Sequence, residues 1–176
     1  EGILDYIPNR GFLAKGFTIK DVMDAFDIRE RLESMAAGIL AEQGITDKQL
    51  EILESCVSQG NELLHNADEL SHADVRIWSE INGRFHTTLV ESADNGLLTS
   101  LLARVDNIPL AAAKSFAGTY NNLDMQRDVI AAAQSEHRWV IDAITEKDRS
   151  WAEYVMRQHV HNGKKKLGQV LENLRN

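Results

Sequence analysis

The sequence predicts an all-α protein, an antiparallel bundle of six or seven helices preceded by a short extended segment. Three observations carry this prediction. From Thr18 onward, apolar residues recur with a helical period almost throughout the chain. Capping residues and short polar breaks divide this stretch into separate helices. No segment after residue 17 has the pattern of a convincing strand.

The breaks between periodic segments give the expected extent of each helix. The first four helices are expected at about Ile19–Glu42, Asp47–His65, Ala73–Ala93 and Leu97–Asp106. An Ala-rich stretch at 109–118 is expected to be helical, and two long helices follow, capped by Asn122 and Asp148 and reaching about Thr145 and Leu174.

Two signals separate the first helix from the second. Gly44 follows the last periodic residue of the first helix, where a left-handed cap is common. Thr46 and Gln49 have the spacing of a capping box, in which each residue binds the other's backbone N–H. We therefore expect a tight connection between the two helices.

Residues 1–17 differ from the rest of the chain. They contain Pro8 and three glycines between short apolar stretches, which indicates two strands joined by a turn, or an extended arm. Such a piece is not stable alone. The sequence begins with Glu1 instead of Met, so we expect a fragment or a processed product.

Composition narrows the function. The 176 residues suit one domain, and the net charge of −8 argues against direct binding to nucleic acid. No apolar run approaches the roughly 20 residues that span a bilayer. The lone Cys56 excludes an internal disulfide and fits a reducing cytosol, so we expect a cytoplasmic protein without membrane contact.

Three histidines lie on the apolar faces of three different helices. His86 falls on such a face one turn after Asn82, while His137 and His159 occupy the middle of apolar stripes farther along the chain. A single buried histidine is usually a hydrogen-bonded core residue. Three of them could instead share a metal ion, which would satisfy all three rings at once. The residue pattern leaves both interpretations open.

Arg29 is a further charged residue on an apolar stripe, one turn before Glu33. One interpretation is a buried Arg29–Glu33 pair. The other is an arginine that faces an internal cavity and binds a carboxylate through its two parallel N–H groups.

Three stretches together resemble the C-terminal ligand-binding domain, the FCD domain, of GntR-type transcriptional regulators of the FadR-like branch. They are "DIRERLESMAAGILAE", "INGRFHTTLVESADNGLL" and "SEHRWVIDAITEKDRSWAEYVMRQHV". Their order and spacing match the family over about residues 18–175. "GILDYIPNRGFLA" resembles the end of a winged helix-turn-helix, which would place the DNA-reading helices upstream of this sequence.

The resemblance implies a helical bundle with an internal ligand cavity. In metal-containing members of the family, one Asp and three His bind a divalent ion. Carried over to this sequence, the ligands are Asn82, His86, His137 and His159, with Asn where many members have Asp. Zinc is the first choice, and nickel or manganese also suit these ligands. The neutral amide is expected to weaken metal binding and to strengthen attraction of an anionic effector.

The resemblance therefore predicts an effector-binding and dimerisation domain at 18–176 and a wing remnant at 1–17. A small carboxylate would bind the metal, Arg29 or both, in a homodimer that contacts operator DNA only through the missing domain. Two alternatives remain. A three-His metalloenzyme would need a general base, and Glu136 is expected to point away from the cluster because it lies about 100° round the helix from His137. A metal-free helical interaction module is the other alternative.

Overall fold

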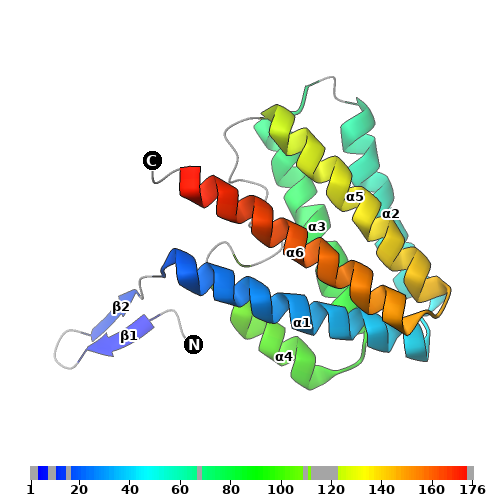
Figure 1. Cartoon of the computed structure of the whole chain (residues 1–176), viewed down its shortest axis with the longest axis horizontal. Coiled ribbons are helices and arrows are strands. Elements are labelled where there is room, and N and C mark those ends of the chain that lie inside the picture. Colours follow the sequence, from blue (N-terminus) through cyan, green and yellow to red (C-terminus); the bar gives the residue numbers. More distant parts are fainter. Residues whose placement is uncertain are drawn as a thin grey trace.

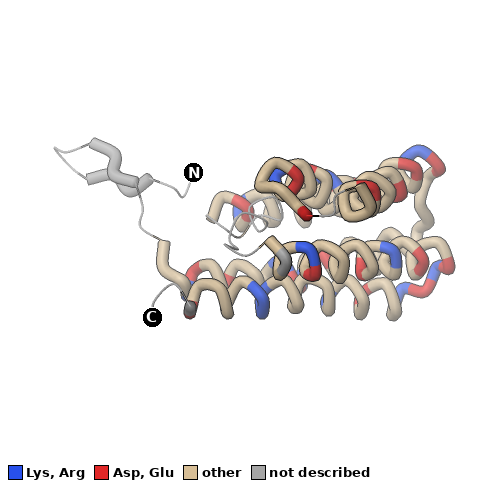
Figure 2. Tube along the Cα trace, turned by 90° about the horizontal axis from the view of Figure 1, so that it is seen from above, with Lys and Arg blue, Asp and Glu red and all other residues tan. Residues whose placement is uncertain are grey.

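The chain forms a bundle of six helices, which Figure 2 shows in two layers, with α1 and the C-terminal helix α6 in the same layer. The computed structural model describes residues 4–7, 11–14, 17–66, 69–108, 111 and 123–173. The helices are α1 (Ile19–Gln43), α2 (Asp47–Asn66), α3 (His72–Ser92), α4 (Gly96–Val105), α5 (Leu123–Thr145) and α6 (Arg149–Asn173). The predicted all-α fold class is confirmed. Among the described residues, no helix combines the length and the apolar character needed to cross a membrane.

The predicted helix boundaries agree with the observed ones to within about one residue. Thr46 and Gln49 form the predicted capping box, with the Thr46 N–H donating to Gln49 Oε1 at 3.0 Å and the Gln49 N–H donating to Thr46 Oγ1 at 3.3 Å. Asp148 Oδ1 accepts from the Trp151 N–H at 2.9 Å, as a helix cap does. Gly44 has a positive φ of 88°, but its ψ of 159° lies outside the predicted left-handed helical region, in a conformation nearly restricted to glycine.

The remaining predicted features concern the parts of the chain outside these helices. The helix expected at 109–118 and the cap expected at Asn122 lie outside the described residues, apart from Ala111. At the N-terminus, the strands β1 (Leu4–Ile7) and β2 (Gly11–Ala14) pair in antiparallel register, as predicted. Their assignment to the wing of a DNA-binding domain stays a prediction.

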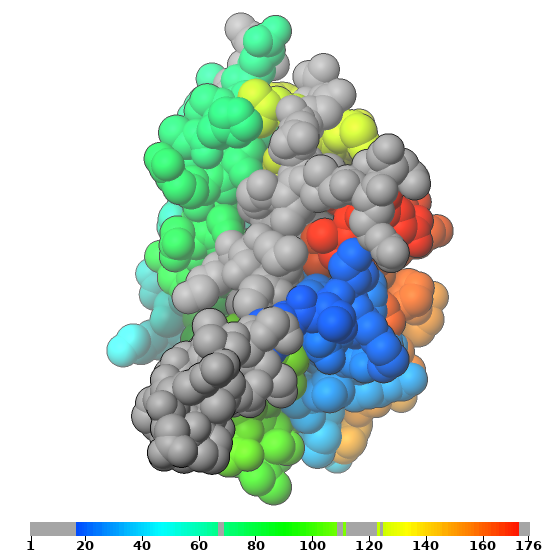
Figure 3. Space-filling model, turned by 90° about the vertical axis from the view of Figure 1, so that its left-hand side faces the viewer, coloured from blue at the N-terminus to red at the C-terminus, as the bar shows by residue number. Residues whose placement is uncertain are grey.

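Helices α1 and α6 run side by side in opposite directions (Figure 1). The start of α1 consequently lies next to the end of α6, as Figure 3 also shows. Helices α3, α4 and α5 contact α1, and α5 also contacts α6, while α2 packs against α3 and α5. This arrangement places the middle turns of α1, α3, α5 and α6 next to one another.

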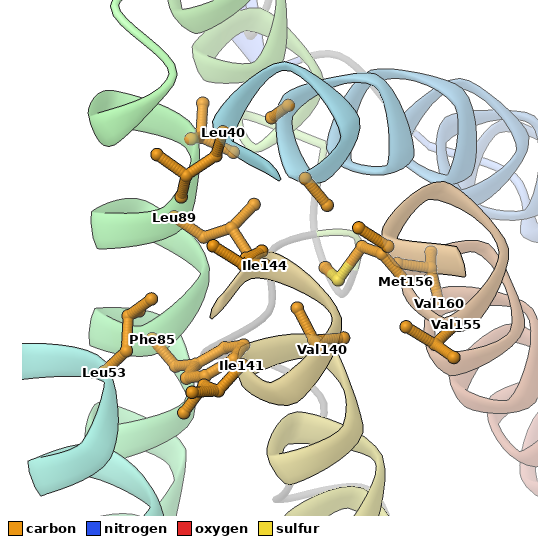
Figure 4. Packing of buried hydrophobic residues seen from close by; sticks show 14 of the residues in the cluster. Leu40, Leu53, Phe85, Leu89, Val140, Ile141, Ile144, Val155, Met156 and Val160 are labelled. Atoms are coloured by element: carbon orange, nitrogen blue, oxygen red, sulfur yellow. The ribbon is translucent and has the colours of Figure 1, made fainter. Parts of the chain in front are cut away.

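Toward the C-terminal ends of α1, α3 and α5 and the start of α6, the same four helices form an apolar core (Figure 4). Leu40 of α1, Leu89 of α3, Ile144 of α5 and Met156 of α6 are all fully buried there. Burial of large aliphatic side chains is the main stabilising contribution to such a bundle. The polar residues singled out in the sequence lie next to this core, from the middle of the four helices toward the start of α1, α3 and α5 and the end of α6. We call this region the cavity half and the apolar core the apolar half.

Candidate metal centre and ligand cavity

The structure brings together the three histidines that the sequence placed on separate apolar stripes. His86 from α3, His137 from α5 and His159 from α6 are all buried. The Nε2 atom of His159 lies 3.1 Å from Nε2 of His86 and 3.2 Å from Nε2 of His137. One ring nitrogen from each residue thus lies within 4.8 Å of the other two, which is close enough for one ion to contact all three. The other three histidines, His65, His72 and His161, are exposed.

In each of these three histidines, the other ring nitrogen, Nδ1, forms a hydrogen bond that orients the ring. The partners are Glu33 Oε2 for His86, Gln134 Oε1 at 3.1 Å for His137, and Glu136 Oε2 at 2.7 Å for His159. All three partners are oxygen acceptors, so each Nδ1 carries the proton. Histidine ligands are commonly oriented by a carboxylate or carbonyl in this way. The Nε2 lone pairs are therefore left facing one another.

Burial favours the neutral form of two of these rings. It lowers the pKa of His86, although the Glu33 carboxylate opposes the change. It lowers the pKa of His137 well below its ordinary value, and the neighbouring histidines act in the same direction. Neutral rings with protons on Nδ1 would place lone pairs about 3 Å apart, which is repulsive unless a cation lies between them. The donor set fits a divalent ion.

Packing fixes the orientation of the His137 ring. The Phe85 ring stacks on it with centroids 3.9 Å apart and an interplanar angle of 21°. Gln134, which accepts from His137 Nδ1, is itself anchored because its Nε2 donates to the Val57 carbonyl at 2.9 Å. The pattern of apolar residues does not predict this contact. The signal in the sequence is that Gln134 lies about one turn before His137 on the same helix.

A cavity borders the cluster, between α1, α3, α5 and α6. Its apolar wall is formed by Phe26, Trp78, Val129, Ala133 and Val160, and its polar wall by Arg29, Asn82, His86, Glu136, His159, Asn162 and Lys166. The interior leaves about 40 Å³ for the centres of water molecules, which is room for roughly three waters. Any small molecule held entirely inside must therefore be compact.

Asn82 belongs to the lining of this cavity. Its buried side chain lines this cavity one helical turn before His86 on α3. Asn82, His86 and His159 line the same cavity, and His137 lies beside His86 and His159. Their assignment as ligands of a metal stays a prediction.

Arg29 is buried and forms the ion pair that was one of its two possible roles. Its Nε donates to Glu33 Oε1 at 2.7 Å, Nη2 lies 2.6 Å from the same oxygen, and Nη1 donates to the Ala111 carbonyl. Burial alone would raise the pKa of Glu33, but the charges of Arg29 and His86 and their hydrogen bonds outweigh burial and lower it to about 2. Glu33 therefore links Arg29 to His86. Arg29 also lines the cavity, so contact with an effector stays a prediction.

The expectation that Glu136 points away from the cluster is wrong. Glu136 lines the cavity, and its carboxylate accepts from His159 Nδ1 and from Asn162 Nδ2, the latter at 2.8 Å. The 100° angle between Glu136 and His137 separates them on α5, but α6 packs beside α5 and meets both faces. Burial raises the pKa of Glu136, and the hydrogen bond from His159 outweighs this effect and lowers the pKa overall.

Comparison with known proteins places this arrangement in a family. The FCD domain matches residues 24–162. The HTH-type transcriptional regulator YdhC of Bacillus subtilis (strain 168) is 27% identical over 173 residues, covering 98% of this chain and 71% of YdhC.

Solved structures show the same fold. Streptococcus agalactiae GntR superposes with a TM-score of 0.63 at 21% identity, over 93% of this chain and 75% of that protein. E. coli McbR/YncC gives a TM-score of 0.68 at 13% identity, over 98% and 78% of the two chains. The match over 24–162 spans most of the sequence. The chain therefore belongs to the FCD family, the C-terminal domains of GntR-type transcriptional regulators.

Proposed function

We propose that this chain is the effector-sensing domain of a GntR/FadR-type regulator and that it binds a small organic acid at a divalent metal. The observation that carries the proposal is the convergence of three Nε2 atoms, with every Nδ1 held by an oxygen acceptor. This arrangement orients three neutral donors toward one point before any ion arrives.

His86, His137 and His159 would hold the ion, with Asn82 as the fourth ligand. Zinc is the first choice, and nickel and manganese are compatible with imidazole and amide donors. Because these four ligands are neutral, the bound ion would keep its full positive charge and attract the effector's carboxylate. Arg29 and Lys166 add positive charge to the cavity wall.

The surroundings of the cluster favour sensing over catalysis. Glu33 and Glu136 are the carboxylates in contact with the histidines, and both already accept Nδ1 hydrogen bonds. A metalloenzyme would need a general base free to take a proton from its nucleophile. The relative YdhC and the solved structure of Streptococcus agalactiae GntR also carry the names of regulators.

We further propose that two copies associate through α1 and α4. These helices are in contact, and Ile28 and Met35 of α1 and Leu97 and Leu101 of α4 expose large apolar side chains. An effector that binds one arrangement of the helices better than another would shift the dimer toward that arrangement. Operator DNA would be contacted by a winged helix-turn-helix preceding this domain.

Metal analysis of untagged protein, purified without chelator, tests the metal site. His159→Ala should lose the ion, whereas the control His161→Ala should keep it, because His161 lies two residues away but is exposed. Equal metal content in the two variants would contradict the assignment. Zero content in the unsubstituted protein after metal loading would favour a metal-free module.

Calorimetric titration of the metal-loaded protein with small carboxylates tests the effector. We expect binding of at least one acid that disappears in His159→Ala and persists in His161→Ala. Folded, metal-loaded protein that binds no acid would contradict the effector assignment while leaving the metal site standing.

A further inference from the structure

Trp78 contributes a buried hydrogen-bond donor to the cavity wall that no group in the described part of the protein satisfies. The residue is 1% exposed, and it lines the cavity together with Asn82 and His86. Its indole Nε1 is buried and has no hydrogen-bond partner among the described residues. Buried indole N–H groups normally find an acceptor.

The position of Trp78 is fixed by α3 and by its packing. Trp78, Asn82 and His86 are spaced four residues apart, so they form one row on the face of α3 that meets the cavity. Trp78 lies eight residues, or about 12 Å along the helix axis, before His86. Its ring belongs to a buried apolar cluster with Val75, Ile130 and others, so the indole is not free to turn toward solvent.

The chemistry of the indole defines what could satisfy it. Its N–H only donates, so the complementary group is an acceptor oxygen. The cavity also has an apolar wall, which includes Phe26, Val129 and Ala133. A ligand that extends from His86 along α3 would pass Asn82 before it reaches the indole of Trp78.

We propose that Trp78 selects effectors by donating its Nε1–H to a second oxygen, remote from the carboxylate that binds at the histidine cluster. This inference rests on the proposed function, since it takes the cluster as the site of the first carboxylate. It narrows the ligand class to slender acids that carry a hydroxyl, oxo or second carboxylate group several atoms away from the first carboxylate. Monocarboxylic acids of equal length without a second oxygen are disfavoured because they leave the indole unsatisfied.

The test compares matched acids on zinc-loaded protein labelled with ¹⁵N at the tryptophan indoles. 4-Hydroxybutyrate is paired with pentanoate and 6-hydroxyhexanoate with heptanoate, so that the two acids of a pair have equal length and charge and differ only by a terminal hydroxyl in place of a methyl group. The chain has three tryptophans, and Trp139 and Trp151, at 54% and 45% exposed, serve as internal controls. Trp139→Phe and Trp151→Phe identify the signals of the exposed indoles, which identifies that of Trp78 by elimination even if Trp78→Phe folds poorly.

We expect the Trp78 N–H resonance to move with at least one of the two hydroxy acids and to stay in place with pentanoate and heptanoate, while the other two indole signals remain fixed. Trp78→Phe should weaken binding of the acid that carries the second oxygen roughly tenfold, because one good hydrogen bond contributes about that much to affinity. The same substitution should leave the affinity for the matched acid without a second oxygen unchanged. Trp139→Phe should change neither of these two affinities.

Two outcomes would overturn the inference in different ways. An acid that binds without moving the Trp78 resonance, and binds Trp78→Phe equally well, would refute the role of Trp78 and leave the proposed function intact. If none of the four acids binds the zinc-loaded protein, the proposed function loses its support and the inference falls with it.

Discussion

The two halves of the bundle use the same helices for opposite purposes. In one half, α1, α3, α5 and α6 contribute apolar side chains such as Leu40 and Ile144, which are fully buried against one another. In the cavity half, from the middle of the same helices onward, Arg29, Glu33 and three histidines are buried beside a cavity. The difference shows that a continuous amphipathic helix can combine a stabilising segment with a recognition segment on one face.

The contrast has an energetic consequence. Burial of aliphatic carbon stabilises the fold in proportion to the area removed from water. A buried charged or polar group contributes little net stability and becomes costly when its partner is lost. We therefore expect substitutions in the apolar half to change the free energy of unfolding most, and those in the cavity half to change binding most.

The largest expected effect on folding comes from Leu40→Ala, in the apolar half. Removing this fully buried side chain should lower the free energy of unfolding by about 2–5 kcal/mol, from lost burial and from the cavity left behind. Denaturant unfolding of metal-free protein measures it. The folded fraction should still bind zinc with unchanged affinity. A matching loss of zinc affinity would show that the two halves are coupled.

The sequence predicts the apolar half more completely than the cavity half, for a physical reason. Helix boundaries depend on local signals such as Thr46 with Gln49, and the buried faces depend on periodicity within one helix. The meeting of His86 with His159 depends instead on how separate helices pack, which no single stripe encodes. The family resemblance supplied that step.

The contacts of the residues that surround the proposed ligands were the hardest to predict. Glu136 was expected to point away from the histidine cluster because of its angle to His137 on α5. That angle does not reveal where α6 lies. Gln134 and the unsatisfied indole of Trp78 have no sequence signature, because each depends on the shape of a neighbouring helix. Arg29 and Glu33 were easier, because their spacing of four residues already favours a pair.

A glycine pair offers a smaller and more specific perturbation. A methyl group added at Gly60 would lie 1.8 Å from Gln134 Nε2, so Gln134 must move away from His137. Loss of such an orienting contact typically weakens metal binding 10–100-fold. We therefore expect Gly60→Ala, like Gln134→Ala, to lower zinc affinity by about that factor in a competition assay with a chromophoric chelator.

Gly38→Ala is the matched control in the apolar half. Its added methyl group would also collide with a side chain, Glu153, at 2.4 Å, but that side chain is flexible and partly exposed. Zinc affinity should be unchanged in this variant. Equal losses from Gly38→Ala and Gly60→Ala would indicate a general packing defect instead of a specific effect on the orientation of His137.

The smallest effect, and the one that best tests the ligand assignment, is expected from Asn82→Asp. A carboxylate is a stronger donor than an amide and cancels one charge of a divalent ion, so zinc affinity should rise by about tenfold, or roughly 1.4 kcal/mol. The same loss of positive charge should weaken binding of an anionic effector to the metal-loaded protein. Competition assays measure the first change and calorimetry the second. Opposite signs in the two measurements are therefore expected, and a zinc affinity that does not change in Asn82→Asp would contradict the assignment of Asn82 as a ligand.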